Sequence, residues 1–431
     1  MIRLRRTRII ALTALTTLCL AALMAPLAFA EAPRLDVVFL IDTTGSMGDE
    51  IAVVKKSIVD MITEIESGKP MPDVRFGLVL YRDRGDMYVT KTFELTRDTD
   101  SVIRAVRDID AGGGGDTPES VNEALHVAVS EINWDADIDT EKTIFLIGDA
   151  KPHYYEQDYR WQDEVKKALD GYIIINTIGC SGLSSEGVSI FTDIAKSSEG
   201  SFQFLTYKSE YVAEDGTVES VMMAGDDYYV MDEDTSGDLW RLGAEEAEKK
   251  GLAEKAEAPA GSGGGMFFAG APMETMTMDA EDGGGGGYYA SGDMENNLDS
   301  ILLAGMKTKM MERGVTYGEP MSYTIVSTGN AGGTPEDSEG IFDSKKELDE
   351  YLGESGIEPA DTSGLDFDTE TAAVFVAGGD RGLGSLSVNE VRRDGDVITV
   401  TLTGEEGGES PYLVLGLPTT DSVAVTYVFL K

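Results

Sequence analysis

The sequence predicts an α/β domain with a mostly parallel sheet over residues 35–205, followed by a flexible glycine-rich linker and a small antiparallel α+β domain. Two observations predict the first domain. Short runs that are mostly apolar alternate with longer segments of helical periodicity. Strand and helix in alternation are typical of a parallel sheet that carries helices on both faces.

Five runs predict the strands of this first domain. Four are mostly apolar and indicate buried strands, at 35–41, 74–81, 143–148 and 172–179. A fifth run, at 87–95, alternates more between apolar and polar residues and predicts an edge strand. Apolar stripes with helical spacing lie between these runs, at 51–65, 121–129 and 190–195.

The first thirty residues predict a secretory signal peptide. A basic start precedes an apolar stretch from about residue 9 to 24, and Ala28-Phe29-Ala30 stands just before Glu31. This order of basic, apolar and small residues is typical of an exported precursor. An uncleaved anchor is the alternative, although the apolar stretch is near but below spanning length. We therefore expect an exported protein, periplasmic, cell-surface or secreted, with no transmembrane span in the mature chain.

Acidic residues dominate the composition. The chain has 431 residues, with 78 Asp and Glu against 35 Lys and Arg, and its formal net charge is −43. A field of this sign repels nucleic acid and anionic lipid and attracts cations, so we expect no nucleic-acid partner. Solubility or adaptation to salt is the alternative reason for most of these acids. Only Cys180 follows the predicted signal peptide, so we expect no internal disulfide.

The middle of the chain predicts a connection between domains. Residues 206–297 are rich in acids, alanine and glycine and predict a low-complexity linker, with one short helix near 242–256. A connecting segment at 298–319 begins with an amphipathic helix. Its apolar positions can share one face, and we expect that face to pack on the last domain: Leu298, Ile301, Leu302, Met306 and Met310.

Residues 320–431 predict the small α+β domain. Ser344 and Glu347 form a capping box that opens a helix through Leu352, which Gly353 closes. Asp394-Gly395 between two β-type runs predicts a hairpin. The predicted strands lie at 371–379, 384–393, 396–404, 411–418 and 423–430.

Three separate pieces of the first domain carry oxygen-bearing side chains at strand or loop ends. Asp42, Thr44 and Ser46 follow the first strand, Thr117 follows a glycine run, and Asp149 follows another buried strand. Because the ends of parallel strands meet at one edge, these side chains are expected to converge there. Two carboxylates and three hydroxyls suit Mg²⁺, Mn²⁺ or Ca²⁺ rather than zinc. Taken one at a time, each residue could instead be a helix cap or a turn residue.

These residues resemble the von Willebrand factor A-type domain and its metal ion-dependent adhesion site. The family's Asp-x-Ser-x-Ser appears as Asp42-x-Thr44-x-Ser46, its loop threonine maps to Thr117, and its later aspartate maps to Asp149. The resemblance covers about 170 residues and departs from the pattern only in Thr44, which keeps the hydroxyl. It implies a Rossmann-like sheet, a divalent cation with Mg²⁺ expected first, and a protein ligand whose Asp or Glu carboxylate completes the metal shell.

The last domain carries a second resemblance. Residues 366–402 and 410–418 look like the C-terminal domain of the PrcB protease-complex stabilising proteins of bacteria. That family usually has a Thr-Gly-Gly-Tyr-like turn where this chain has Gly382-Leu383-Gly384-Ser385. The resemblance implies binding to a protein partner, with a protease among the candidates, and no catalysis of its own. An unrelated sandwich-like domain is the alternative.

Three functions are compatible with these patterns. The first is an exported bacterial adhesion or scaffold protein that binds a partner carboxylate through the metal. The second is a scaffold or stabiliser of a secreted protease that acts through the last domain. The third, a metal-dependent hydrolase, lacks a clear general base, since His126 and His153 are the only histidines. We therefore expect no enzyme. An acidic run at 232–243 begins like an EF-hand but has Gly243 where the bidentate Glu belongs.

Overall fold

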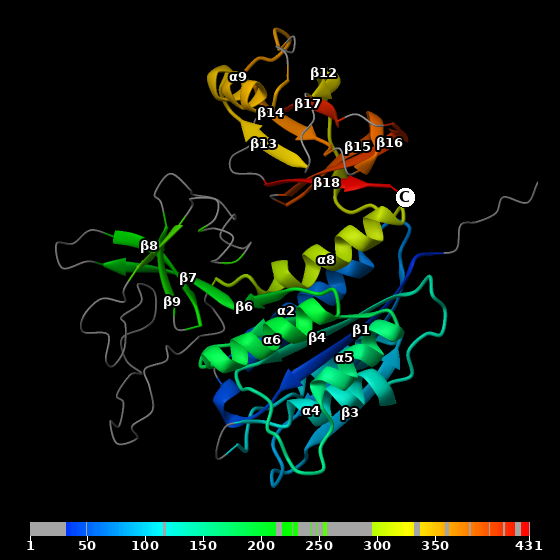
Figure 1. The fold of residues 1–431 in the computed structure, drawn as a ribbon, viewed down its shortest axis with the longest axis vertical. Coiled ribbons are helices and arrows are strands. Elements are labelled where there is room, and N and C mark those ends of the chain that lie inside the picture. Colours follow the sequence, from blue (N-terminus) through cyan, green and yellow to red (C-terminus); the bar gives the residue numbers. More distant parts are fainter. Residues whose placement is uncertain are drawn as a thin grey trace, which may run out of the picture. The chain divides into compact units, whose positions relative to one another are not determined.

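The structure is a computed structural model, drawn in Figure 1. It describes residues 32–48, 50–114, 118–212, 218–225, 227–231, 243, 248, 253–256, 295–331, 337–357, 362–378, 381–395, 397–407, 410–418 and 424–430. The expected signal peptide at 1–30, the candidate ligand Thr117 and nearly all of the EF-hand-like run at 232–243 lie outside these residues. Among the helices that are described, none is long and apolar enough to cross a membrane.

A six-stranded sheet forms the centre of the first domain. Its strand order is β3-β2-β1-β4-β5-β6, and only the edge strand β3 runs antiparallel to its neighbour. The predicted mostly parallel sheet and the predicted edge strand are thereby confirmed. The strands are β1 (Arg34–Asp42), β2 (Asp73–Tyr81), β3 (Thr90–Thr96), β4 (Glu141–Gly148), β5 (Ile173–Gly179) and β6 (Phe202–Phe204).

Helices bury both faces of this sheet, because successive side chains of a strand point to opposite sides. Val37 and Phe39 of β1 belong to the core that contains α2 and α3, whereas Val38 and Leu40 belong to the core of α4, α5 and α6. The short helices α3 and α5 carry few apolar residues and were not predicted. The helices are α2 (Ile51–Glu66), α3 (Thr99–Arg107), α4 (Val121–His126) with a π-helical turn at Val127–Glu131, α5 (Trp161–Asp170) and α6 (Ser185–Ser197).

Helix α8 (Leu298–Glu312) packs beside α2, as Figure 1 shows, although 231 residues of chain separate the two. Leu298, Leu302, Met306 and Met310 are buried in the same core as the apolar side of α2. The predicted helix and its buried stripe are therefore present, but the expectation that it packs mainly on the last domain was wrong. Apolar periodicity identifies the face that a helix buries but not the element that covers it.

Four short antiparallel strands occupy part of the expected linker, in the order β10-β9-β8-β7. They are β7 (Thr206–Val212), β8 (Val218–Ala224), β9 (Asp227–Met231) and β10 (Ala253–Ala256). The end of the expected helix at 242–256 is thus a strand. Val221 and Met223 join the main core, while Met222 and Met231 form a separate cluster, so both faces of this sheet are apolar. These short apolar strands could not be recognised in the sequence, because the average composition of residues 206–297 is acidic.

Two four-stranded sheets and the helix α9 make up the described residues of the last domain. Apolar residues of both sheets form a shared core, and Leu348 and Leu352 of α9 cover the outer side of the first sheet. The order of the first sheet is β12-β17-β14-β13 and that of the second is β11-β15-β16-β18. The elements are β11 (Glu319–Pro320), β12 (Thr324–Ala331), β13 (Ser338–Phe342), α9 (Lys345–Glu354), β14 (Glu370–Val376), β15 (Leu383–Asp394), β16 (Val397–Glu406), β17 (Ser410–Pro418) and β18 (Ala424–Phe429).

Most local predictions for the last domain agree with these elements, but α9 continues to Glu354, so Gly353 lies inside the helix and does not close it as expected. The side chain of Ser344 accepts a hydrogen bond from the backbone N–H of Glu347, as a helix cap does. Gly395 has φ +59° in the turn between β15 and β16, a conformation that glycine adopts without strain. One detail differs from the expected antiparallel unit, because β16 and β18 are parallel. The domain bounds expected from the sequence stay predictions.

Candidate metal centre

The segment after β1 folds back on the carboxylate of Asp42. The side chain of Asp42 is buried, and its Oδ1 accepts hydrogen bonds from the backbone N–H of Thr44 (2.9 Å) and from the hydroxyl of Thr44 (2.7 Å). The hydroxyls of Thr44 and Ser46 lie 3.1 Å apart. A turn of 3₁₀ helix starts at Gly45. Three oxygen-bearing side chains are therefore held together within five residues.

Asp149 reaches the same edge from β4. Ile41 of β1 pairs with Ile147 of β4, so Asp42 and Gly148 stand side by side at the ends of the two strands. A Cβ on Gly148 would lie 2.5 Å from the hydroxyl of Tyr81 and 3.2 Å from Cβ of Asp42, so glycine is required for this approach. Burial raises the pKa of Asp42 to about 7, and the negative charge of Asp149 adds to the shift.

The glycine loop approaches these residues from the other side. The backbone N–H of Gly112 donates to the carbonyl of Thr43 (3.0 Å), and that of Gly45 donates to the carbonyl of Gly113 (3.1 Å). Gly114 has φ +67°, and a Cβ there would lie 3.1 Å from Cβ of Thr44. The loop therefore bends toward the end of β1 as expected. Thr117 lies outside the described residues, and its part in the site stays a prediction.

Glu119 is a candidate that sequence reasoning missed. Its side chain is only 1% exposed, and its Oε2 has no hydrogen-bond partner among the residues that the structure describes. Burial raises the pKa of Glu119 to about 8, and the charges of Asp42, Asp83, Asp149 and Asp86 contribute to the rise. In the sequence, an acid just before a helix is indistinguishable from a residue that favours the helix N-terminus. Its burial depends on tertiary structure.

The donor set at this edge fits a hard divalent cation. Oδ2 of Asp42, like Oε2 of Glu119, is buried and has no partner with hydrogen-bond geometry within the described part of the chain, although the nearby hydroxyl of Tyr81 partly opposes the rise in the pKa of Asp42. Buried carboxylates that raise one another's pKa are stabilised in the ionised form by a bound cation. Within the same part of the chain, no three Asp, Glu, His or Cys side chains form a ready-made metal cage. Such a site therefore depends on hydroxyl oxygens and water beside the carboxylates.

Asp83 connects the loops that surround this edge. It follows β2, and its two carboxylate oxygens accept hydrogen bonds from the hydroxyls of Ser120 (2.8 Å) and Tyr155 (2.6 Å). Nδ1 of His153 lies 3.6 Å from Oδ2 of Asp83. Asp83 thus links the β2–β3 loop to the start of α4 and to the loop after β4.

The two histidines lie in different clusters. His153 stacks on Tyr155 beside Asp83, whereas Nδ1 of His126 lies 3.1 Å from Oε1 of Glu164. They do not come together as zinc ligands. Cys180 is buried and free, and burial raises the pKa of its thiol, so it has the character of a core residue.

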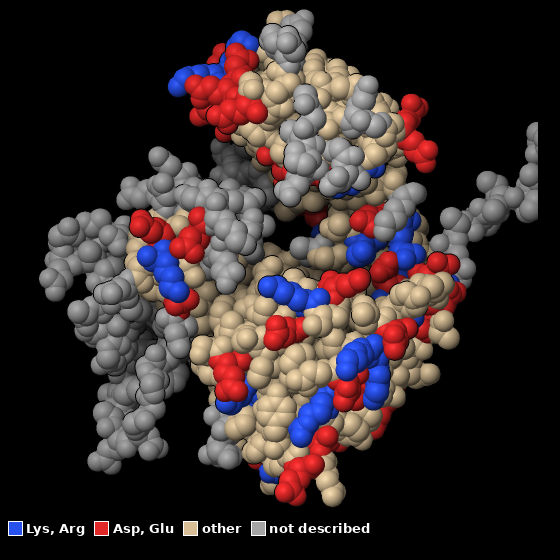
Figure 2. Space-filling view, viewed as in Figure 1, with Lys and Arg blue, Asp and Glu red and all other residues tan. Residues whose placement is uncertain are grey.

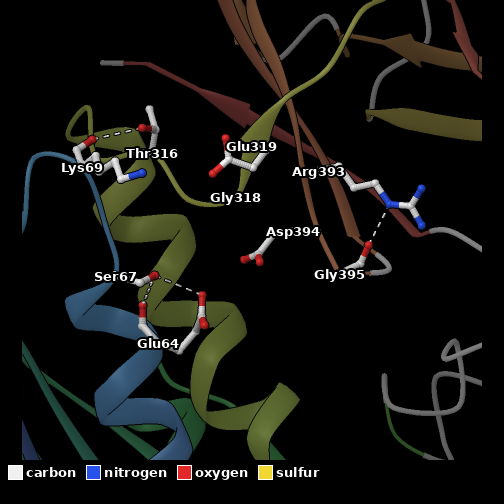
Figure 3. A pocket seen from close by; sticks show the side chains of 9 residues that line it. All are labelled: Glu64, Ser67, Lys69, Thr316, Gly318, Glu319, Arg393, Asp394 and Gly395. Carbon is white, nitrogen blue, oxygen red and sulfur yellow. Dashed lines mark hydrogen bonds between the residues drawn. The ribbon is translucent and has the colours of Figure 1, made fainter.

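Charge is mixed on the face of the molecule that Figure 2 shows. On the face that Figure 2 shows, the described Lys and Arg lie among Asp and Glu, without one continuous basic patch. Figure 3 shows a polar pocket at the far end of α2, which Glu64, Lys69, Thr316, Arg393 and Asp394 help to line. Lys307 bridges two of its acids, at 2.6 Å from Glu64 and 2.5 Å from Asp394. Two of the acids that line this pocket are therefore paired with a lysine.

Comparisons with known proteins identify a domain family for the first part of the chain. Residues 36–206 match the family model of the von Willebrand factor A domain. Von Willebrand factor A domain-containing protein 7 of Homo sapiens is 36% identical over 120 residues, which cover 28% of this chain and 12% of that protein. The alpha-protein kinase vwkA of Dictyostelium discoideum is 31% identical over 120 residues, 27% of this chain and 19% of the kinase. The chain thus spans less than a fifth of the length of either relative.

Among solved structures, proximal thread matrix protein 1 from the mussel byssus, in a form with a zinc-occupied MIDAS motif, is 17% identical. The match covers 40% of this chain and 42% of that one, with a TM-score of 0.33. The family match and the sheet with helices on both faces together support a von Willebrand factor A domain at residues 36–206.

Proposed function

We propose that this chain is a protein-binding module that holds a divalent cation at Asp42, Thr44, Ser46 and Asp149, with Thr117 completing the set. The observation that carries the proposal is the buried carboxylate of Asp42. It stands beside Asp149, its pKa is raised to about 7, and its Oδ2 has no hydrogen-bond partner in the described part of the chain. Burying such an acid costs stability unless a cation compensates its charge.

The donor set favours a partner that supplies a carboxylate. Mg²⁺ binds proteins through one or two carboxylates and keeps several waters, which suits two aspartates and three hydroxyls. Such an ion retains positive character and exchangeable positions. An Asp or Glu side chain of another protein can replace a water there. We expect Mg²⁺ first, while Mn²⁺ and Ca²⁺ accept the same hard oxygens.

Binding without catalysis is the function that we propose for the whole chain. His153, the candidate base of the alternative hydrolase, is held between Asp83 and Tyr155, with its Nδ1 buried. This placement supports a structural role for His153 rather than proton transfer. Export through the predicted signal peptide, and a second protein-binding surface on the last domain with a protease among its partners, belong to the same proposal.

Metal binding can be tested directly on the mature full-length chain. Isothermal titration with Mg²⁺ is expected to give a saturable site that disappears in Asp42→Ala. Asp60→Ala is the matched control, since Asp60 is an exposed aspartate on α2 that pairs with Lys56. A blocked peptide with one Asp side chain should then bind in Mg²⁺ and dissociate in EDTA. Equal Mg²⁺ affinity for Asp42→Ala and Asp60→Ala would contradict the proposal.

A further inference from the structure

We call the end of the sheet around Asp42 and Asp149 the metal edge. The loop that leads from the metal edge into α5 is rich in aromatic side chains. We call residues 153–160 the tyrosine segment, because Tyr154, Tyr155 and Tyr159 lie within it. None of these tyrosines belongs to the candidate ligand set. Tyr154 is 47% exposed and Tyr159 is 39% exposed, so both present aromatic surface to solvent.

Tyr155 fixes the first half of the tyrosine segment. Its ring stacks on His153 with centroids 4.0 Å apart, and the guanidinium of Arg84 lies 4.0 Å from its centroid. Its hydroxyl donates to Asp83 (2.6 Å). Arg84 also lies 3.1 Å from Asp158 of the same segment. The β2–β3 loop therefore holds the tyrosine segment through charge, stacking and a hydrogen bond.

The two exposed tyrosines are held just as firmly. The ring of Tyr159 stacks on His126 with centroids 3.5 Å apart. The hydroxyl of Tyr154 accepts a hydrogen bond from Nε1 of Trp161 (3.1 Å), and the guanidinium of Arg160 lies 5.1 Å from its ring centroid. Both rings are partly exposed and are held by neighbouring side chains. A ring in this state loses little conformational entropy when a partner covers it, which makes it an efficient contact residue.

The tyrosine segment and the metal edge are joined through Asp83. The same carboxylate accepts from Tyr155 in the segment and from Ser120, the neighbour of Glu119. In addition, the backbone N–H of His153 donates to the carbonyl of Glu119 (2.7 Å). A protein that places a carboxylate at the metal edge therefore has the tyrosine segment close to its flanking residues.

We propose that the tyrosine segment binds an aromatic or large apolar side chain of the partner, next to the acid that reaches the metal. This inference rests on the proposed function and adds the class of partner, an acidic protein segment with a neighbouring aromatic residue. Cations also bind aromatic rings. However, the guanidinium of Arg160 already lies over the exposed ring of Tyr154, and its Nη1 is buried without a hydrogen-bond partner among the described residues, so a further cation at that ring is repelled. Exposed Glu156 and Gln157 supply the polar rim that surrounds an apolar contact.

Blocked synthetic peptides test the inference on the mature full-length chain. The reference peptide has one Asp among Gly and Ser and no terminal charge. A second peptide adds Phe near the Asp, a third adds Arg in place of that Phe, and a fourth has Phe with Asn in place of Asp. Fluorescence anisotropy in Mg²⁺ is expected to show roughly 10-fold tighter binding of the Phe peptide than of the reference. The Arg peptide should show no such gain.

Two variants test which tyrosines cause the tighter binding of the Phe peptide. The double variant Tyr154→Ala/Tyr159→Ala should lose the preference for Phe and keep the affinity for the reference peptide. Tyr172→Ala should keep both the preference for Phe and the affinity for the reference peptide. Tyr172 is 63% exposed but lies just before β5, at the ends of the strands opposite to the metal edge. A Phe preference that is absent from the unaltered chain, or that survives the double variant, would overturn the inference.

The proposed metal function fails by a different result. If EDTA and Asp42→Ala leave the affinity for the reference peptide unchanged, the metal does not bind the carboxylate. A Phe preference that then still depends on Tyr154 and Tyr159 would support the tyrosine segment as a contact surface without the metal. Circular dichroism of each variant should show that the fold is retained.

Discussion

The hydroxyl of Thr44 donates to Oδ1 of Asp42 at 2.7 Å and lies 3.1 Å from the hydroxyl of Ser46. Threonine thus places its oxygen between the carboxylate and the serine, while its side chain is fully buried, with Cβ close to Gly114 of the glycine loop. The hydroxyl is the chemically active part of this side chain, and the methyl group is a packing element.

Two substitutions of Thr44 separate these parts. Thr44→Ser should keep Mg²⁺ affinity within a few-fold and cost about 1 kcal/mol of stability through the lost methyl group. Thr44→Val keeps the shape and removes the hydroxyl. It should weaken Mg²⁺ by at least the roughly 10-fold that loss of an outer-shell partner costs. Isothermal titration measures both, and equal affinities for the Ser and Val variants would show that the Thr44 hydroxyl is not used.

The metal-free chain should lose stability as the pH rises. The pKa of Asp42 is raised to about 7 in the folded chain, against an ordinary value of 3.8, because burial and Asp149 disfavour its ionised form. Between these values the unfolded chain releases a proton that the folded chain retains, so rising pH favours unfolding. The free energy of unfolding in EDTA should therefore fall from about pH 4 to about pH 7.

The variant Asp42→Asn tests whether Asp42 causes this fall in the free energy of unfolding. The variant cannot ionise at this position, so in EDTA at pH 8 it should be more stable than the unaltered chain by a few kcal/mol, because a tenfold change in acid strength corresponds to roughly 1.4 kcal/mol. Asp60→Asn, at an exposed site, should follow the unaltered chain. Urea unfolding across the pH range gives the measurement. A profile of Asp42→Asn that parallels the unaltered chain would assign the pH dependence to other groups.

The substitution Glu119→Gln should raise the stability of the metal-free chain and weaken the binding of Mg²⁺. Its pKa is raised to about 8, so Glu119→Gln removes a buried acid and should stabilise the metal-free chain at pH 8. If its orphaned Oε2 faces the bound ion or its water, the same variant should weaken Mg²⁺ by about 10-fold. Thermal unfolding in EDTA and titration with Mg²⁺ measure the two effects. A variant with higher metal-free stability and unaltered Mg²⁺ affinity would place Glu119 outside the metal's surroundings.

Sequence patterns were most informative where one local rule decides the outcome. Buried parallel strands are continuously apolar, so β1, β2, β4 and β5 could be predicted within one or two residues. A strand that ends in an acid, such as Asp42 or Asp149, is visible for the same reason. Their convergence could be predicted because parallel strands end at a common edge.

Burial and packing in the folded chain could not be predicted from local sequence patterns. Glu119 is one of 78 acids, and only the folded chain shows that it is buried with an unpartnered oxygen. The strands β7–β10 are short and lie in a segment whose average composition is polar. The apolar stripe of α8 was visible, but its packing against α2 depends on which surface the rest of the fold leaves uncovered. The misses at Glu119 and α8 concern contacts between segments that are distant in the sequence, whereas β7, β8 and β9 pair with their neighbours along the chain and were missed because of their polar surroundings.

Helix α8 should stabilise the first domain, although it lies beyond residue 206, where the family match ends. Leu302 is fully buried in the core that α8 shares with α2, so Leu302→Ala should cost about 2–5 kcal/mol. Hydrogen exchange should then quicken in α2 as well as in α8, because the variant removes packing from both helices. Ile325→Ala is the matched control, since Ile325 is 51% exposed on β12 and should change stability by less than about 0.5 kcal/mol. Faster exchange in α8 with unaltered protection of α2 would mean that α2 does not depend on α8 for its stability.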